Sequence, residues 1–279
     1  MHLSSRFTHP LLLLGVIYLI VVAVAIESIV HAQINLIQKT VSRQNSALAG
    51  GIKAQIFERY SDAQALAMNP ILSEVLRHPA TPKLGLAKDL LNSFVRLYLV
   101  YSSSVVTDPA GRVVVSGLMN PHAKSLPDFA GIVQAAAVSQ EKTHITNLYE
   151  RSEWPTEQSD DRFQVFTSAI TAPSGKVLGY VHNVASTMYV DRELMRARDQ
   201  FFHSLEVEPQ LGVFSESGTL LRKSVGSEVS GDVLSFQDLV DDEKNLSQPT
   251  WQVRMQIASN LITGPIRKLG WISHALSVL

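Results

Sequence analysis

The sequence contains no cysteine. This absence excludes disulfide bonds, thiolate zinc sites, iron–sulfur clusters and cysteine nucleophiles. An excess of charge of either sign is missing as well, because 24 Lys and Arg residues face 25 Asp and Glu residues and the formal net charge is -1. Nucleic-acid-binding proteins usually carry a basic surplus, so we expect no nucleic-acid partner.

Motifs for catalysis and cofactor binding are also missing. The nine histidines form no HxxxH or HExxH pair, and the chain has no Walker loop, dinucleotide-binding glycine motif or GxSxG elbow. The acidic runs Asp160-Asp161 and Asp241-Asp242-Glu243 lack the regular oxygen spacing of a calcium loop. We therefore predict that the protein is not an enzyme and uses no metal and no cofactor.

An unbroken apolar run of sixteen residues, Leu11 to Ile26, is the strongest local signal in the chain. At about 1.5 Å per residue it extends roughly 24 Å, and with its flanking turns a helix here can cross a hydrocarbon core of about 30 Å. A buried helix of a globular core would normally carry a polar stripe, and this run has none. It predicts a transmembrane helix over residues 10–32.

The apolar run has two interpretations. It is either a retained anchor or a secretory signal cleaved after Val30-His31-Ala32, and its length favours the anchor. Arg6 precedes the run and no acid does, so residues 1–9 are expected in the cytoplasm. The bulk of the chain would then lie in the periplasm, with a single pass through a bacterial inner membrane.

Residues 33–68 show helical spacing, and Pro70 predicts a break near Asn69. A helix of about 35 residues would be about 52 Å long, more than a compact domain needs. It would lie along the flank of its own domain, and its upper stripe would pair with a second copy in a homodimer. Gly50-Gly51 inside it would mark a hinge or a close helix crossing.

Three segments read as β-hairpins: residues 105–115, 170–178 and 213–221. In the first two, Pro109 and Pro173 preset φ near −65°, and a glycine two residues later supplies a positive φ. Further elements are expected from pattern and propensity. They are strands at Phe163–Ile170, Gly179–Val184 and Trp251–Ile257, and helices at Lys83–Phe94, Asp128–Val138 and Met188–Phe202.

The order of these elements resembles the double Cache domain, the extracytoplasmic sensor of bacterial chemoreceptors, sensor kinases and cyclic-nucleotide signalling enzymes. The resemblance rests on a membrane helix followed by "AQALAMNPILSEVL", "VVTDPAGRVVVSG", "VFTSAITAPSGKVLGYVHNV" and "GVFSESGTLLRKSV". It implies an α+β fold with two stacked PAS-like antiparallel sheets on one long helix. The domains would be a long juxtamembrane helix (33–79), a distal ligand-binding subdomain (80–203) and a proximal subdomain (204–258).

The resemblance also implies a small-molecule ligand on the distal sheet. Amino-acid sensors of this family hold the ligand with a Tyr, Arg and Trp cluster and a late-strand aspartate, whose place here is taken by Asn183. An amide cannot match an ammonium as a carboxylate does, so an organic anion held by Arg151 or Arg162 is the expected ligand. The candidate ligand-binding residues are Tyr101, Tyr149, Arg151, Trp154, Arg162, Tyr180 and Asn183, with Tyr98 and Phe166 beside them. The alternative is that these aromatics pack the core and that Arg162 forms an exposed ion pair.

Residues 259–279 contain "GPIRKL", which resembles the start of a HAMP linker. Gly264, Pro265, Arg267 and Lys268 prevent this segment from spanning a bilayer, so no second span is expected. The sequence therefore predicts an anchored sensor for transmembrane signalling, most like that of methyl-accepting chemotaxis proteins. Two alternatives remain: a secreted or anchored solute-binding protein, and a truncated receptor of a histidine kinase or diguanylate cyclase type.

Overall fold

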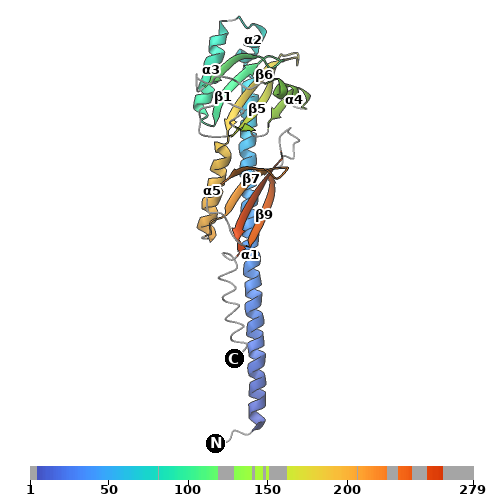
Figure 1. Ribbon diagram of the computed structural model, residues 1–279, viewed down its shortest axis with the longest axis vertical. Coiled ribbons are helices and arrows are strands. Elements are labelled where there is room, and N and C mark those ends of the chain that lie inside the picture. The colour runs from blue at the N-terminus through green and yellow to red at the C-terminus, as the bar shows by residue number, and fades with distance from the viewer. Residues whose placement is uncertain are drawn as a thin grey trace.

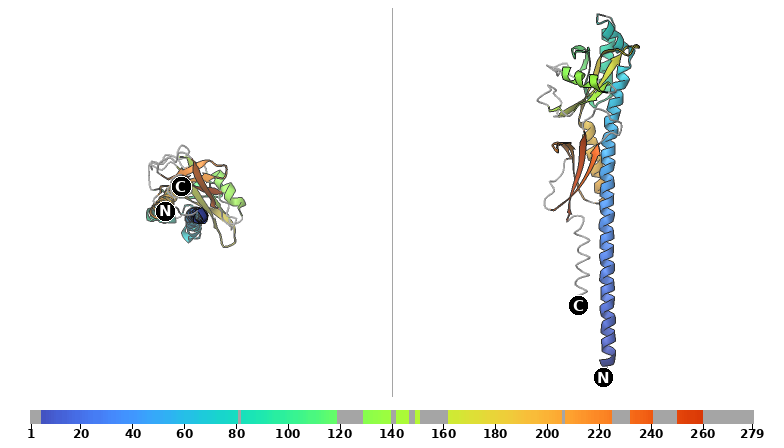
Figure 2. Two further views of the ribbon diagram at one scale, coloured as in Figure 1. Left: turned by 90° about the horizontal axis from the view of Figure 1, so that it is seen from below. Right: turned by 90° about the vertical axis from the view of Figure 1, so that its right-hand side faces the viewer.

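The computed structural model describes residues 5–80, 82–118, 129–139, 142–146, 149–150, 162–205, 207–224, 232–240 and 250–259. Its central feature is one long helix that carries two antiparallel sheets, one above the other, along its upper half (Figures 1 and 2). The predicted α+β fold with a long N-terminal helix and two stacked sheets is confirmed.

Helix α1 runs without interruption from Ser5 to Ala67, a length of about 95 Å. Its N-terminal part is the one helix among the described residues that is long and apolar enough to cross a membrane, and none of the residues in its most apolar stretch is buried. Leu12, Leu13 and Tyr18 are each exposed over about two thirds of their surface. Such exposure fits a lipid-facing helix and does not fit the core helix of a globular domain.

The predicted helix break lies at Asn69, which caps the short helix α2 (Pro70–Arg77). The Asn69 side-chain oxygen accepts a hydrogen bond of 3.0 Å from the backbone N–H of Ile71. Pro70 occupies the first turn, where its missing N–H costs nothing. Helix α3 (Lys83–Leu97) follows and returns the chain to the first sheet.

The upper sheet, farthest from the N-terminus, is entirely antiparallel. Its strand order is β2-β1-β6-β5-β3, and β4 pairs with β5 at the same edge as β3. The strands are β1 (Tyr101–Thr107), β2 (Val113–Leu118), β3 (Thr143–Ile145), β4 (Tyr149–Glu150), β5 (Arg162–Thr171) and β6 (Val177–Ser186). Helices α1, α2 and α3 cover one face, and helix α4 (Ala130–Val138) lies on the other.

The lower sheet follows helix α5 (Met188–Leu205), which descends beside α1. Its order is β8-β7-β10-β9, again antiparallel. The strands are β7 (Gln210–Ser215), β8 (Leu220–Lys223), β9 (Val233–Val240) and β10 (Trp251–Ala258). Alternate residues of β10, from Trp251 to Ile257, are buried in the same core as Ile52 and Ile56 of α1. The two sheets therefore share one apolar core along the long helix.

All three predicted hairpins are present, and each turn contains a glycine with positive φ. The values are 83° at Gly111, 80° at Gly175 and 82° at Gly218. In the first turn the backbone N–H of Gly111 bonds to the carbonyl of Asp108 at 3.0 Å, and in the second that of Gly175 bonds to Ala172 at 2.8 Å. The turn chemistry of the sequence thus determines where these strands reverse.

Gly51 in α1 lies beneath two side chains of α5, and α1 continues through it without a hinge. A Cβ built on Gly51 would lie 2.7 Å from a carboxylate oxygen of Glu193 and 3.1 Å from a guanidinium nitrogen of Arg196. The adjacent Gly50 has nothing within 4 Å of the same position. Of the two predictions for this glycine pair, the structure supports the helix crossing, at which side chains of α5 cover Gly51.

The two adjacent glycines make a matched test of that crossing. We expect Gly50→Ala to raise the free energy of unfolding by about 1 kcal/mol, the difference in helix propensity. Gly51→Ala should gain clearly less stability than Gly50→Ala, because the Glu193–Arg196 pair must move to admit the methyl group. Urea unfolding of the two variants measures both values, and equal stabilisation by both alanines would contradict the crossing.

Candidate functional site

The face of the upper sheet that α4 covers carries a row of side chains across five strands. Strand register aligns Ser116 with Val105, Val105 with His182, His182 with Thr167, and Thr167 with His144. Residues aligned in this way point to the same face of an antiparallel sheet. Phe129 stacks on the ring of His182, with a centroid distance of 4.4 Å, which identifies this face as the α4 side.

His182 at the centre of the row is completely buried and fully hydrogen-bonded. The Thr107 hydroxyl lies 2.9 Å from Nε2, and the Thr167 hydroxyl lies 2.9 Å from Nδ1. A neutral imidazole has one donor and one acceptor nitrogen, so one threonine accepts a hydrogen bond and the other donates one. Burial lowers the pKa of His182 to about 3, so the ring is neutral at physiological pH.

The two ends of the row have unused hydrogen-bonding capacity. Within the described residues, the buried Oγ of Ser116 and the buried Nδ1 of His144 have no hydrogen-bond partner. Burial also lowers the pKa of His144, which keeps its ring uncharged. The row spans four strand spacings, about 19 Å, so Ser116 and His144 mark two separate ends of this face. Both can bond a solute or a water molecule.

The buried state of His182 makes stability depend on pH. The folded state holds fewer protons on this ring than the unfolded state, whose histidine titrates at pKa 6.5, so stability falls as pH falls from about 6.5 toward 3. Between pH 6.5 and 5 the loss is about 2 kcal/mol. We expect the His182→Gln variant to be less stable than the parent at pH 7. Its free energy of unfolding, measured with urea, should no longer show this decrease between pH 6.5 and 5. A slope unchanged in the variant would assign it to other groups.

The opposite face, toward α1, holds Asn183 and Tyr101. The Ser104 hydroxyl donates a 2.7 Å hydrogen bond to the Asn183 side-chain oxygen, and both residues are fully buried. The Asn183 Nδ2 has no partner among the described residues. Because successive strand residues alternate between faces, Asn183 and His182 point to opposite sides of the sheet.

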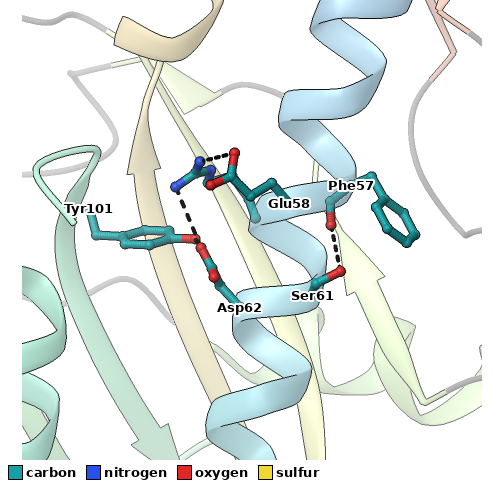
Figure 3. Close-up of polar contacts among 6 residues, drawn as sticks. Phe57, Glu58, Ser61, Asp62 and Tyr101 are labelled. Carbon is teal, nitrogen blue, oxygen red and sulfur yellow. Dashed lines mark hydrogen bonds and ion pairs between the residues drawn. The ribbon is translucent and has the colours of Figure 1, made fainter. Parts of the chain in front are cut away.

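Tyr101 connects this sheet to a charged cluster on α1, shown in Figure 3. Its hydroxyl donates a 2.6 Å hydrogen bond to a carboxylate oxygen of Asp62. Arg59 lies 3.4 Å from the same oxygen and 2.6 Å from a carboxylate oxygen of Glu58. Only 8% of the Arg59 side chain and 16% of the Asp62 side chain are exposed. Burial raises the pKa of Asp62, against the opposing effects of Tyr101 and Arg59.

The structure places the predicted ligand-binding residues in three groups. Tyr101 and Asn183 lie on the α1 face, and Tyr180 lies on the α4 face, packed against Val133 and Ala136. Strands β4 and β5 bring the backbones of Tyr149 and Arg162 together, where Glu150 is aligned with Arg162. Arg151 and Trp154 lie outside the described residues.

Several polar residues at these positions were not singled out from the sequence. They are Thr107, Thr167 and His182 on the α4 face, and Arg59 and Asp62 in α1. The sequence pattern that could have identified them is a polar residue in an apolar setting. His182 lies at the centre of an otherwise apolar strand, and Arg59 lies in the apolar stripe of a helix. No group of three or more His, Cys, Asp or Glu side chains within the described residues could hold a metal ion.

Solved structures with this architecture are sensory domains of bacterial receptors. No family model matches the sequence, and no curated protein matches it. The sensory domain of the Campylobacter jejuni chemoreceptor Tlp3 superposes with a TM-score of 0.56 at 11% identity, over 84% of this chain and 98% of that one. The class of fold is therefore that of extracytoplasmic Cache-type sensor domains.

Two further solved structures come from different kinds of receptor. The ligand-binding domain of the Pseudomonas fluorescens chemoreceptor CtaA, in complex with L-leucine, has a TM-score of 0.55 at 17% identity, over 85% of this chain and 99% of that one. A domain of a sensory box/GGDEF family protein from Vibrio parahaemolyticus has a TM-score of 0.55 at 13% identity, over 83% and 99%. One fold thus serves receptors with different outputs.

Proposed function

We propose that this protein is a membrane-anchored sensor, which binds a small solute outside the cell and takes part in transmembrane signalling. The observation that carries the proposal is the continuity of α1. One uninterrupted helix joins the apolar stretch that begins at Leu12 to the core shared by both sheets. A change in how the upper sheet packs on this helix is thereby connected directly to the membrane segment.

The proposed setting is a bacterial inner membrane, crossed once, with both sheets in the periplasm. Chemotaxis is the proposed output, since two of the structural neighbours are sensory or ligand-binding domains of chemoreceptors.

We further propose that two copies associate through α1. Leu36, below the sheets, is exposed over 66% of its surface and would be covered in such a dimer. Binding without chemical conversion is the proposed activity, and no cofactor is required for it.

We place the solute on the α4 face of the upper sheet. The β-strand residues described on this face include no aspartate or glutamate; its polar groups are hydroxyls and neutral imidazoles. A carboxylate is what an amino-acid ammonium group would favour. This supports an organic anion over an amino acid, with Arg151 as the proposed cationic partner.

A thermal-unfolding screen of the full-length chain in lipid nanodiscs tests the proposal. Amino acids, organic acids, amines and purines are the panel, and a solute at 100 times its Kd should add about 2.7 kcal/mol of stability. Organic acids should stabilise the chain, and Arg151→Ala should reduce this stabilisation. Arg112→Ala, at an arginine that is 83% exposed in a hairpin turn, is the matched control. A cooperatively unfolding chain that no solute stabilises would contradict the sensor.

A secreted solute-binding protein is the second candidate, and it rests on the possible cleavage after Ala32. In the structure this bond lies inside α1, which continues for 35 residues beyond it. Mass determination of the chain from purified membranes separates the two candidates. An intact N-terminus supports the anchored sensor, and a chain beginning at Gln33 supports the secreted protein.

A further inference from the structure

A cleft opens at the tip of the molecule, between the α1–α2 corner and the far end of β5. Its volume is about 490 Å³, within the range of small-molecule sites. Helix α1 contributes Gln64 and Ala67, Met68 follows directly after it, and helix α2 contributes Pro70, Ser73 and Arg77. The lining is completed by Lys142 and by the end of β5 with its turn, at Ser168, Ala169, Thr171, Ala172 and Pro173. The cleft lies at the end of the upper sheet, apart from the His182 row.

The charges of the cleft have one sign. Arg77 and Lys142 both line it, and none of the described lining residues is acidic. Glu74, the only acid in α2, already pairs with Lys83 at 2.5 Å. Lys142 uses one N–H to reach the Gly175 carbonyl at 3.4 Å, which leaves two donors of its ammonium group. Two cations facing one concave space favour an anion there.

The remaining lining indicates what kind of anion fits. Ala67, Met68, Pro70 and Pro173 offer apolar surface, and Ser73, Ser168 and Thr171 offer hydroxyls. A bare inorganic ion would leave the apolar surface in contact with water, whereas an organic acid would cover it with its carbon skeleton. Half of the lining residues are apolar and half are polar or charged, and small-molecule sites combine apolar surface with placed polar groups in this way.

The backbone conformation of Lys142 keeps this residue at the rim of the cleft. Lys142 is the only non-glycine residue with positive φ among the described residues, at 53°. Its carbonyl accepts a 3.0 Å hydrogen bond from the N–H of Ala169, which ties it to β5 where β3 begins. A left-handed conformation is unfavourable for a lysine. Here it holds the residue at the rim of the cleft.

From the cleft, its two cations and its apolar half we infer a second solute site, which takes a small organic acid. It is separate from the site proposed on the α4 face, and it does not depend on that site being occupied.

Titration calorimetry of the full-length chain in nanodiscs tests the site, with succinate and tricarballylate as probes. Succinamide is the uncharged control, and inorganic phosphate the control without a carbon skeleton. We expect an organic acid to bind more tightly than phosphate and succinamide not to bind. Arg77→Gln and Lys142→Gln should each weaken binding about tenfold or more, the usual effect of removing a charged hydrogen-bond donor.

The control variants are Arg112→Gln, on a turn outside the cleft, and Arg151→Gln, in the proposed α4-face site. Neither should change binding in the cleft. Three results would overturn the inference: no heat of binding from either acid at millimolar concentration, equal binding of phosphate and the acids, or full affinity in Arg77→Gln/Lys142→Gln. Affinity lost in Arg151→Gln instead would assign the anion to the α4-face site alone.

Discussion

Replacing Arg59 by leucine is expected to lower the free energy of unfolding by about 3 kcal/mol, the usual cost of removing one partner from a buried ion pair. The guanidinium lies between Glu58 and Asp62 with only 8% of its side chain exposed, and Asp62 also accepts a hydrogen bond from Tyr101. Without Arg59, the Asp62 carboxylate keeps only the Tyr101 hydroxyl as a described partner. Urea unfolding of the full-length chain measures the loss.

The pH dependence of Arg59→Leu identifies the cause of that loss. Burial already raises the pKa of Asp62, and removal of the neighbouring cation raises this pKa further. Since protonation then relieves the buried charge, the variant should recover stability relative to the parent as pH falls from 8 to 5. Asp62→Asn in the same chain should restore part of the loss at pH 8. A comparable loss in Arg112→Leu, at an exposed arginine, would show that the effect is not specific to the buried cluster.

Gly179→Ala is expected to destabilise the upper sheet by about 3 kcal/mol or more, at the upper end of overpacking effects. A methyl group on Gly179 would overlap the backbone carbonyl of Thr107 and lie 2.9 Å from a methyl carbon of Leu76. The Thr107 backbone is held in β1 by pairing with both β2 and β6, so it cannot move away without breaking the ladder. Urea unfolding followed by circular dichroism measures the effect.

Gly131→Ala is the matched control, because a Cβ at Gly131 in α4 meets nothing within 4 Å. That variant should be neutral or more stable by up to about 1 kcal/mol. A Gly179→Ala chain as stable as the parent would mean that β1, β6 and α2 do not pack as closely as described.

Features set by local chemistry could be predicted from the sequence. The hairpin turns depend on a glycine at one position, the helix break on Asn69-Pro70, and the long apolar helix on an unbroken apolar run, so each is visible within a short window. Strand β9 was not predicted. Its partner β10 lies beyond residues 241–249, and Val233–Val240 combines Ser235, Gln237 and Asp238 with apolar residues, so pairing rather than propensity determines this strand.

The candidate site was less predictable because it depends on register and on contacts between distant residues. Asn183 was expected to face a ligand on the distal sheet, but neighbouring strand residues point to opposite faces, and the α4 face receives His182. Tyr101 was expected to contact ligand, and its hydroxyl bonds to Asp62, 39 residues away in the chain. The ligand-binding role of both residues stays a prediction, as it does for Tyr149, Arg151, Trp154, Arg162 and Tyr180.

Between His31 and Leu36, helix α1 is a stalk with no buried residue, and it lies below Ile37, which packs against the core of the sheets. Each residue added to such a stalk would turn everything above it by 100° about the helix axis and lift it by about 1.5 Å. Seven added residues make two full turns to within about 20°. They would raise the two sheets along the helix axis and leave their rotation about that axis nearly unchanged. In the proposed membrane-anchored sensor, the residue count of the stalk therefore sets both the height of the two sheets and the direction in which they face around the membrane normal.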